Sequence, residues 1–474
     1  MDTRITAPKG AVLLGGLEDW QILQQENGAA LVTLHGEYHA KRLASDPPVT
    51  FSDTENPRGV TVKARVVLEN TAGEVVPWTE CALSDGQWAV TLKVPAGGLY
   101  RLELTMTYGG ADGYTVTRGD MVRHWGVGDV FVIAGQSNAA GRAKDEFPDP
   151  PVLGVNLLRN SGVWDIAAHP MNDCTGAVYE GHYENHNPGH GPFLAFAKRL
   201  RAELGYPIGL IMTAYGGSPL RWWNPEENGA LLGEAVRMVK THSPKVKAML
   251  WYQGEADGME ETGDTYLSRF AAFVGAARAE LGAPKLPVFT LQLARCTYTT
   301  TDGLDKHWGL VRDAQVKAAK TLSGVYVVPT LDLELYDSAH LSTAGNIKLG
   351  ERVAVSALSE LYGIRAAWQA HELLRAEAQE DGSVLLKFSH CAQWLDPFGV
   401  PPEALPFSLE GGMGLYKRPV SWKTKEDGEI LLTFATPVKP GMKLHGAWEM
   451  NPPAYIPCNE NRLPFLAFYG REIT

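Results

Sequence analysis

Residues 130–138 read Val-Phe-Val-Ile-Ala-Gly-Gln-Ser-Asn, and this stretch decides the fold. Its first five residues form a continuous apolar run, which is typical of a strand buried on both faces of a parallel sheet. Ser137 follows at a tight strand-to-helix turn, where its hydroxyl would face a cleft and the helix N-terminus would favour negative charge. The stretch therefore predicts a buried strand and a candidate nucleophile, although a serine that only caps a helix shows the same local pattern.

Similar apolar runs recur along the chain, at residues 208–212, 246–251, 288–291 and 325–329. Segments with helical periodicity lie between them, at residues 193–204, 231–240, 266–281, 310–322 and 344–362. Strands that alternate with helices predict an α/β fold, in which helices cover both faces of a parallel sheet. The functional residues of such sheets lie at the carboxyl ends of the strands.

Both ends of the chain show a different pattern. Residues 60–68 alternate apolar and polar side chains, and short strand-like segments separated by Gly and Pro continue to about residue 125. Strand-like segments return after about residue 366. We predict a β-sandwich-like module over residues 1–125, a catalytic domain over 126–365 and a β-rich region over 366–474.

The composition argues against several classes of partner. The chain has 43 Lys and Arg against 54 Asp and Glu, a net charge of −11, whereas nucleic acids and anionic membranes are bound through basic patches. No apolar run approaches the roughly 20 residues that span a bilayer, and the first residues lack a signal-peptide core. The five cysteines are scattered, without zinc-type spacing. We expect no nucleic-acid or membrane partner, no metal and no cofactor. We also expect a cytoplasmic location, while a processed secreted form stays open; the oligomeric state is not predicted.

Asp337 and His340 form a second candidate group, after the last predicted strand and before the last predicted helix. Residues three apart can face each other on one helical turn. A carboxylate on Nδ1 fixes the tautomer of an imidazole and leaves Nε2 free to take a serine proton. The order Ser, Asp, His along the chain is also that of many α/β hydrolases, so we predict a triad of Ser137, Asp337 and His340.

Two further motifs follow predicted strands and supply candidate oxyanion donors. Gly217 lies in Tyr-Gly-Gly-Ser at residues 215–218, and Gln253 in Trp-Tyr-Gln-Gly-Glu at residues 251–255. A glycine amide can approach a substrate closely. We predict that the backbone N–H groups of Ser137 and Gly217 and the side-chain amide of Gln253 bind the oxyanion.

These blocks resemble the SGNH hydrolase superfamily, and more narrowly its sialate O-acetylesterase branch, which includes acetyl xylan esterases. The resemblance covers about residues 128–354. It implies a flavodoxin-like three-layer fold, with Ser137 as nucleophile, His340 as base and Asp337 as the residue that orients the histidine. The third block of the wider superfamily is Gly-x-Asn-Asp, whose Asn donates to the oxyanion. Gln253 stands in that place here, as in the narrower branch.

The resemblance implies a serine esterase that removes O-acetyl groups from a carbohydrate, either sialic acid or a plant-type polysaccharide or oligosaccharide, through an acetyl-enzyme. Its partner would be the acetylated carbohydrate. Two other functions stay open. One is a carbohydrate-binding protein on an inactive hydrolase fold, and the other is a lipid or thioester hydrolase of the same superfamily.

The candidate substrate-binding residues are Gln136, Asn138, Trp222, Trp223, Glu255 and His186. The tryptophan pair could stack on sugar rings or pack in the core, and Glu255 could instead brace its loop. His186 belongs to the segment 181–190, in which three histidines are spaced by four residues. Gly and Pro make a helix improbable there, so we expect a substrate-lining or solvated loop rather than a metal site.

Overall fold

The computed structural model describes residues 10–39, 59–110, 113–179, 183–184, 188–298, 303–411 and 415–474. The chain divides into two compact units, each built from several segments. The first unit contains Met1–Phe131, Pro150–Ala168 and Leu200–Ile211, and the second contains Val132–Asp149, His169–Arg199 and Met212–Thr474.

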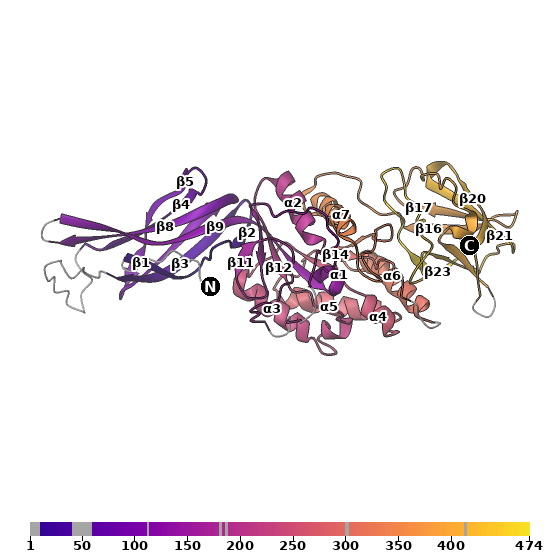
Figure 1. Ribbon diagram of the computed structural model, residues 1–474, viewed down its shortest axis with the longest axis horizontal. Coiled ribbons are helices and arrows are strands. Elements are labelled where there is room, and N and C mark those ends of the chain that lie inside the picture. The colour runs from indigo at the N-terminus through magenta and orange to yellow at the C-terminus, as the bar shows by residue number, and fades with distance from the viewer. Residues whose placement is uncertain are drawn as a thin grey trace. The chain divides into compact units, whose positions relative to one another are not determined.

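The first unit is rich in antiparallel strands, shown in indigo and violet in Figure 1. The strands up to Gly135 are β1 (Gly10–Gly15), β2 (Ile22–Gln24), β3 (Ala29–His39), β4 (Thr61–Leu68), β5 (Glu74–Glu80), β6 (Ala82–Ser84), β7 (Gln87–Pro95), β8 (Gly97–Gly110) and β9 (Gly113–Gly135). The short strand β2 pairs with β9 in parallel. One sheet has the order β1-β3-β7-β6, while β4 pairs with β5 and β8, and β8 pairs with β9. Alternate side chains of β4 are buried, as the sequence pattern predicts for a strand with one face on a core.

Strand β9 runs from the first unit into the second. The boundary that we predict between residues 125 and 126 therefore falls inside one continuous strand. The first unit also contains β10 (Val155–Leu158), β11 (Trp164–Ile166) and most of β12 (Ile208–Met212). Strand β10 pairs with β12 in parallel and with β11 antiparallel.

The second unit holds the central parallel sheet, with the order β9-β13-β14-β15. Its further strands are β13 (Ala248–Tyr252), β14 (Val288–Leu291) and β15 (Val325–Val328), and their side chains are almost entirely buried. The helices are α1 (Ser137–Ala140), α2 (Phe193–Leu204), α3 (Ala230–His242), α4 (Glu255–Met259), α5 (Tyr266–Glu280), α6 (Leu304–Thr321) and α7 (Thr343–Tyr362). This architecture confirms the predicted α/β fold class, because helices flank a parallel sheet and antiparallel sheets lie on either side of it in the sequence.

The C-terminal part of the second unit forms two antiparallel sheets, drawn in yellow in Figure 1. Their orders are β16-β17-β21-β20 and β19-β18-β22-β23. The strands are β16 (Leu373–Ala378), β17 (Val384–Phe388), β18 (Phe407–Glu410), β19 (Tyr416–Lys417), β20 (Pro419–Thr424), β21 (Glu429–Phe434), β22 (Lys443–Gly446) and β23 (Phe468–Glu472). Their inner faces enclose a core that includes Phe388, Phe407, Leu432 and Phe465.

The side chain of Arg312 ties helix α6 to this C-terminal region. It is fully buried, and its guanidinium donates to the carbonyl oxygens of Leu293 (2.9 Å), Ala294 (2.7 Å) and Ala447 (2.8 Å). The carbonyl oxygens of Glu449 (2.5 Å) and Met450 (3.4 Å) accept two further hydrogen bonds. Burial lowers the pKa of Arg312 to about 9, so the group remains a cation at neutral pH.

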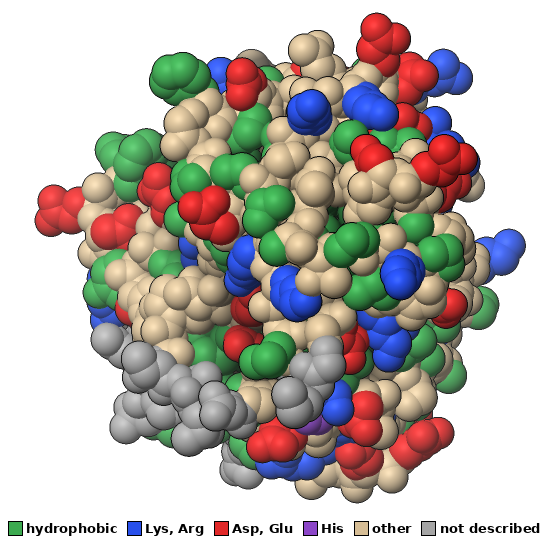
Figure 2. All heavy atoms as spheres, turned by 90° about the vertical axis from the view of Figure 1, so that its right-hand side faces the viewer, with side chains coloured by type: hydrophobic (Ala, Val, Ile, Leu, Met, Phe, Trp, Pro, Cys, Tyr) green, Lys and Arg blue, Asp and Glu red, His purple; other side chains and the backbone are tan. Residues whose placement is uncertain are grey.

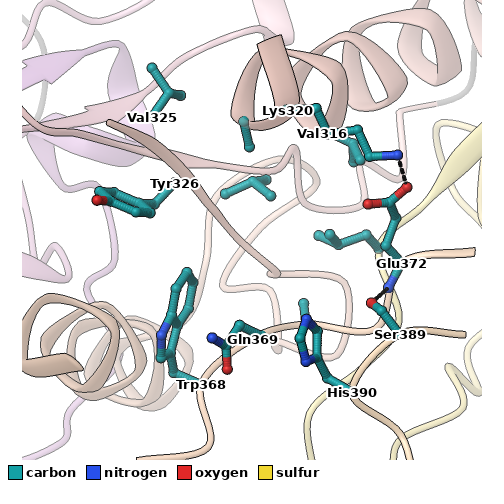
Figure 3. Close-up of a pocket in the computed structure, with 13 residues that line it drawn as sticks. Val316, Lys320, Val325, Tyr326, Trp368, Gln369, Glu372, Ser389 and His390 are labelled. Carbon is teal, nitrogen blue, oxygen red and sulfur yellow. Dashed lines mark hydrogen bonds and ion pairs between the residues drawn. The ribbon is translucent and has the colours of Figure 1, made fainter. Parts of the chain in front are cut away.

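A cavity of about 230 Å³ lies where helix α6 and strand β15 meet the C-terminal region. Val316 and Leu466 are among its apolar lining residues, and Lys320 and Glu372 form an ion pair at its side (Figure 3). No residue of the predicted triad lines this cavity.

The surface seen in Figure 2 mixes acidic, basic and hydrophobic side chains, without an extended area of one charge among the described residues in that view. No helix of the described residues is long and apolar enough to cross a membrane.

Candidate active site

Ser137 begins helix α1, two residues after Gly135, the last residue of strand β9. Gly135 has a φ of +126°, and a Cβ built on it would lie 2.2 Å from the carbonyl oxygen of Tyr252. Only glycine permits the chain to turn at this point so close to strand β13. The turn brings the Ser137 side chain, which is partly exposed, to the carboxyl end of the central sheet.

The structure brings the three predicted triad residues together. The Nε2 atom of His340 lies 2.9 Å from Ser137 Oγ, and its Nδ1 atom lies 2.7 Å from Asp337 Oδ2. When Nδ1–H donates to the carboxylate, Nε2 is left as the acceptor that faces the serine hydroxyl. This arrangement can withdraw the Ser137 proton as the serine oxygen attacks an acyl carbon.

The Asp337 side chain also shapes its own turn. Its second oxygen, Oδ1, accepts hydrogen bonds from the backbone N–H groups of Ala339 (2.8 Å) and His340 (2.7 Å). Partial burial acts to raise the pKa of Asp337, but these hydrogen bonds and the one from the His340 ring outweigh it and lower the pKa. Asp337 is therefore ionised at neutral pH and can stabilise an imidazolium.

Asn138 clamps the backbone on both sides of His340. Its Nδ2 donates to the carbonyl oxygen of Ala339 (3.1 Å), and its Oδ1 accepts from the N–H of Leu341 (3.2 Å). The second Nδ2 hydrogen goes to Glu255 Oε1 (2.7 Å), and burial raises the pKa of Glu255. One buried amide thus joins the nucleophile turn, the loop after β13 and the histidine loop.

Two backbone N–H groups are free to bind an oxyanion. Those of Ser137 and Gly217 have no hydrogen-bond partner among the residues that the structure describes. Gly217 is exposed with a φ of +66°, and a Cβ there would meet no atom within 4 Å. These are the two backbone donors that the sequence predicts.

A buried ion pair holds the turn that presents Gly217. The N–H of Gly216 donates to Glu184 Oε2 (2.5 Å), and Glu184 also pairs with Arg142 and accepts from Asn172 Nδ2 (2.5 Å). The Glu184 side chain is 1% exposed. Sequence reasoning missed this role, because nothing in the spacing of Glu184 relates it to a turn some 30 residues later.

Comparisons with known proteins bear on this geometry. Residues 127–359 match the family model described as "Carbohydrate esterase, sialic acid-specific acetylesterase". A probable carbohydrate esterase of Arabidopsis thaliana is 32% identical over 258 residues, which are 48% of this chain and 90% of that protein. The chain belongs to the sialic acid-specific acetylesterase family of carbohydrate esterases. The predicted family resemblance is thereby confirmed.

The fold has a solved counterpart. The crystal structure of a carbohydrate acetylesterase from Xanthomonas citri aligns with a TM-score of 0.63 and 22% identity, and the alignment covers 97% of this chain and 99% of that one. At this identity the likeness concerns the fold alone. It extends over the N- and C-terminal β regions of this carbohydrate esterase as well as over the central sheet.

Gln253 does not match its predicted part as an oxyanion donor. Its side chain is fully buried, and its Nε2 donates to the carbonyl oxygen of Ser218 (3.2 Å) and to Asp257 Oδ2 (2.6 Å). Both amide hydrogens are therefore already used, and Oε1 accepts from the Tyr266 hydroxyl (3.0 Å). The prediction that Gln253 binds the oxyanion is wrong for this geometry, because the amide is part of the scaffold.

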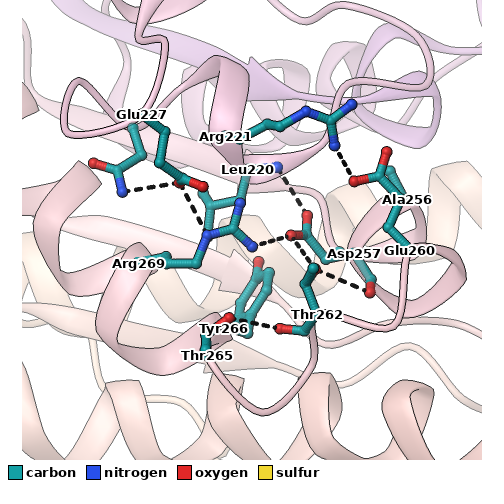
Figure 4. Close-up of polar contacts among 12 residues, drawn as sticks. Leu220, Arg221, Glu227, Ala256, Asp257, Glu260, Thr262, Thr265, Tyr266 and Arg269 are labelled. Carbon is teal, nitrogen blue, oxygen red and sulfur yellow. Dashed lines mark hydrogen bonds and ion pairs between the residues drawn. The ribbon is translucent and has the colours of Figure 1, made fainter.

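Asp257 is the centre of that scaffold, and the sequence analysis overlooked it (Figure 4). Its buried carboxylate accepts from the Leu220 N–H (2.8 Å), from Arg269 Nη1 (2.7 Å) and from the Thr262 hydroxyl (2.9 Å), in addition to Gln253. Its place four residues after Gln253 is the one signal that could have suggested the contact. Asp257 thereby connects helix α4 to helix α5 and to the turn after Gly217.

Most of the predicted substrate-binding side chains turn inward. Gln136 is 4% exposed, and its Oε1 accepts from the N–H groups of Gly254 (3.3 Å) and Ala256 (3.2 Å). Trp223 is fully buried and donates its indole N–H to Ser218 Oγ (2.9 Å). The prediction of substrate contact is wrong for Trp223, because its indole N–H is satisfied inside the protein. For Gln136 it stays a prediction, because these hydrogen bonds use its Oε1 and not its Nε2.

The remaining substrate-binding predictions have different outcomes. Asn138 and Glu255 are 3% and 9% exposed and brace the loops that carry Ser137 and His340, as described above, so the structure does not support substrate contact for them. Trp222 is partly exposed, and its role stays a prediction. His186 lies outside the described residues.

One group of side chains has the composition of a metal site, namely Asp149, His169 and His190. Both histidine Nε2 atoms lie near Asp149 Oδ2, at 3.2 Å and 3.0 Å, and Lys198 Nζ donates to Oδ1 (2.6 Å). The two imidazole rings stack with a centroid distance of 3.8 Å. In this arrangement one carboxylate joins two imidazoles and one ammonium.

Replacing Asn138 with Asp in this esterase tests its positioning role. Aspartate keeps the size of the side chain but cannot donate to Ala339 O, and it places a second carboxylate against Glu255. We expect kcat to fall about 10²-fold with KM little changed, since a misplaced base slows chemistry more than binding. The measurement is steady-state hydrolysis of p-nitrophenyl acetate.

The double variant Asn138→Asp, Glu255→Gln is the matched control. Its new glutamine amide can donate to the new aspartate, so it should recover part of the lost kcat. A double variant no more active than the single one would contradict the clamp between these two side chains.

Proposed function

We propose that this carbohydrate esterase is a serine O-acetylesterase that acts through an acetyl-enzyme, with an acetylated carbohydrate as its substrate. The observation that carries the proposal is the relay from Ser137 Oγ to His340 Nε2 (2.9 Å) and from His340 Nδ1 to Asp337 Oδ2 (2.7 Å). Family membership supports the substrate class.

In the first step, Ser137 Oγ attacks the acetyl carbonyl carbon while His340 Nε2 takes its proton. The oxygen of the tetrahedral intermediate accepts hydrogen bonds from the N–H groups of Ser137 and Gly217. The sugar oxygen then leaves and takes the proton from His340. Asp337 stabilises the imidazolium between these two transfers.

In the second step, a water molecule enters where the sugar hydroxyl has left. His340 removes a proton from the water, which attacks the acetyl-enzyme, and then returns a proton to Ser137 Oγ. Acetate and the free enzyme result. Both steps use only residues of this chain, and each donor of the proposed oxyanion site is a backbone N–H, since the amide of Gln253 is engaged elsewhere.

The proposal is tested with a panel of esters. We expect acetyl esters to be hydrolysed faster than octanoyl esters, and acetate to be released from at least one acetylated glycan, as followed by mass spectrometry. Preference for the octanoyl ester, together with no acetate release from any acetylated sialic acid, xylan or oligosaccharide, would favour a lipid or thioester hydrolase instead.

A further inference from the structure

The first unit contains a pocket of about 450 Å³, which is within the size range of small-molecule sites. It lies among the turn after strand β4, the starts of strands β8 and β10, and the end of helix α2. Its side chains include Glu69, Leu99, His124, Leu153, Arg201 and Tyr206. None of them belongs to the site around Ser137.

Arg201 gives the pocket a free positive charge. Its guanidinium has no hydrogen bond or ion pair among the residues that the structure describes, although acidic residues outnumber basic ones in the chain. A guanidinium presents parallel N–H donors that match a carboxylate. An unpaired arginine on a pocket wall therefore favours an anionic ligand group.

Glu69 and His124 form the polar part of another wall. Glu69 Oε2 accepts from the His124 backbone N–H (3.1 Å) and lies 2.8 Å from its Nδ1. His124 has a φ of +58°, and its ring stacks at 4.1 Å on that of Trp20, whose φ is +64°. Non-glycine residues in this conformation are strained and are retained where the surroundings or function require them. The pair holds the Glu69 carboxylate and the imidazole in fixed positions, where they can accept hydrogen bonds from hydroxyl groups.

The remaining lining, apart from Asn70, is largely apolar. Leu99, Leu153, Pro207 and the ring of Tyr206 line the pocket, and the Tyr206 hydroxyl is fixed by a hydrogen bond to Asp129 (2.8 Å). Such surfaces suit the C–H face of a pyranose ring. The Glu69 carboxylate, meanwhile, repels a dianion more strongly than a monoanion.

We propose that this pocket is a second carbohydrate site, which binds an acidic sugar of one or two rings separately from the catalytic centre. The carboxylate of the sugar pairs with Arg201, its hydroxyls donate to Glu69, and its C–H face lies against Leu153 and Tyr206. The inference does not depend on Ser137 or on an acetyl group.

The test is calorimetric titration of the full chain, at low salt, with glucuronic acid, glucose, glucose 6-phosphate and acetate. We expect glucuronic acid to bind at least about ten times more tightly than the other three, and its affinity to fall with salt because the contact is ionic. Arg201→Gln should weaken glucuronic acid binding at least about tenfold. Arg199→Gln removes the same charge from an exposed position of the same helix and should leave binding unchanged.

Leu153→Trp provides a second variant, which fills the pocket from an exposed position without changing charge. It should also abolish glucuronic acid binding, while hydrolysis of p-nitrophenyl acetate stays at the wild-type rate in all three variants. Equal binding of glucuronic acid by the wild type, Arg201→Gln and Leu153→Trp would overturn the proposal. Tighter binding of glucose 6-phosphate or of acetate than of glucuronic acid would also overturn the proposal. It would show that the pocket selects a phosphate group or a simple carboxylate rather than an acidic sugar.

Discussion

Replacement of Ser137 by alanine is expected to lower kcat for p-nitrophenyl acetate by on the order of 10⁴–10⁶, because the acyl-enzyme can no longer form. KM should change little, since Ser137 Oγ contributes a bond to the transition state rather than to the bound ester. The stability should also change little, because the side chain is partly exposed and its hydroxyl has His340 as its one hydrogen-bond partner among the described residues. Initial rates over a range of ester concentrations measure kcat and KM, and the midpoint of thermal unfolding measures the stability.

The matched control is Ser338→Ala, which removes another hydroxyl from the loop that carries Asp337 and His340. Its kcat should remain near that of the wild type. A second control compares Ser137→Ala with the double variant Ser137→Ala, His340→Ala. Because the two residues act as one unit, the double variant should be no slower than the single. Wild-type turnover in Ser137→Ala would show that another residue is the nucleophile.

Replacement of Arg312 by leucine is expected to reduce the free energy of unfolding by about 3–5 kcal/mol. The guanidinium donates to five backbone carbonyl oxygens, and leucine leaves all of them without that donor in a buried place. The carbonyls of Ala447, Glu449 and Met450 belong to the C-terminal region, so that region should also become more sensitive to limited proteolysis. Equilibrium urea unfolding measures the free energy.

Lys317→Gln is the control on the same helix. Lys317 is 55% exposed and forms an i,i+4 pair with Asp313, whose side chain is only 6% exposed, so its loss should cost about 1–2 kcal/mol, still less than the loss of Arg312. Arg312→Lys should lie between the wild type and Arg312→Leu, because an ammonium has three N–H donors for five acceptors. An Arg312→Leu protein as stable as Lys317→Gln would show that the five hydrogen bonds do not hold the two regions together.

The grouping of Ser137, Asp337 and His340 and the fold class could be predicted from the sequence because their signals are local. The apolar run before Ser137, the strand and helix alternation and the three-residue spacing of Asp337 and His340 are each contained in a short segment. Positions at the carboxyl ends of parallel strands then converge in any fold of this class. The family blocks added the expected role of each triad residue.

The scaffold residues could not be predicted, because their partners are distant in sequence. Gln253 and Glu255 are two residues apart in a single motif, yet the amide of Gln253 donates to Ser218 and Asp257, while Glu255 accepts from Asn138. Whether a polar side chain near a nucleophile faces a ligand or the interior depends on which donors and acceptors the fold places beside it. The sequence contains the polar groups but not their pairing.

The sequence by itself therefore determined the central strand, the α/β class and the members of the triad. Only the tertiary structure decided how the triad is supported. Asn138 holds both peptide groups beside His340, and Glu184, which is far from Gly216 in the chain, fixes the turn that exposes the N–H of Gly217. The physical reason is that a buried polar atom must find a partner, and that partner is set by three-dimensional packing rather than by sequence spacing.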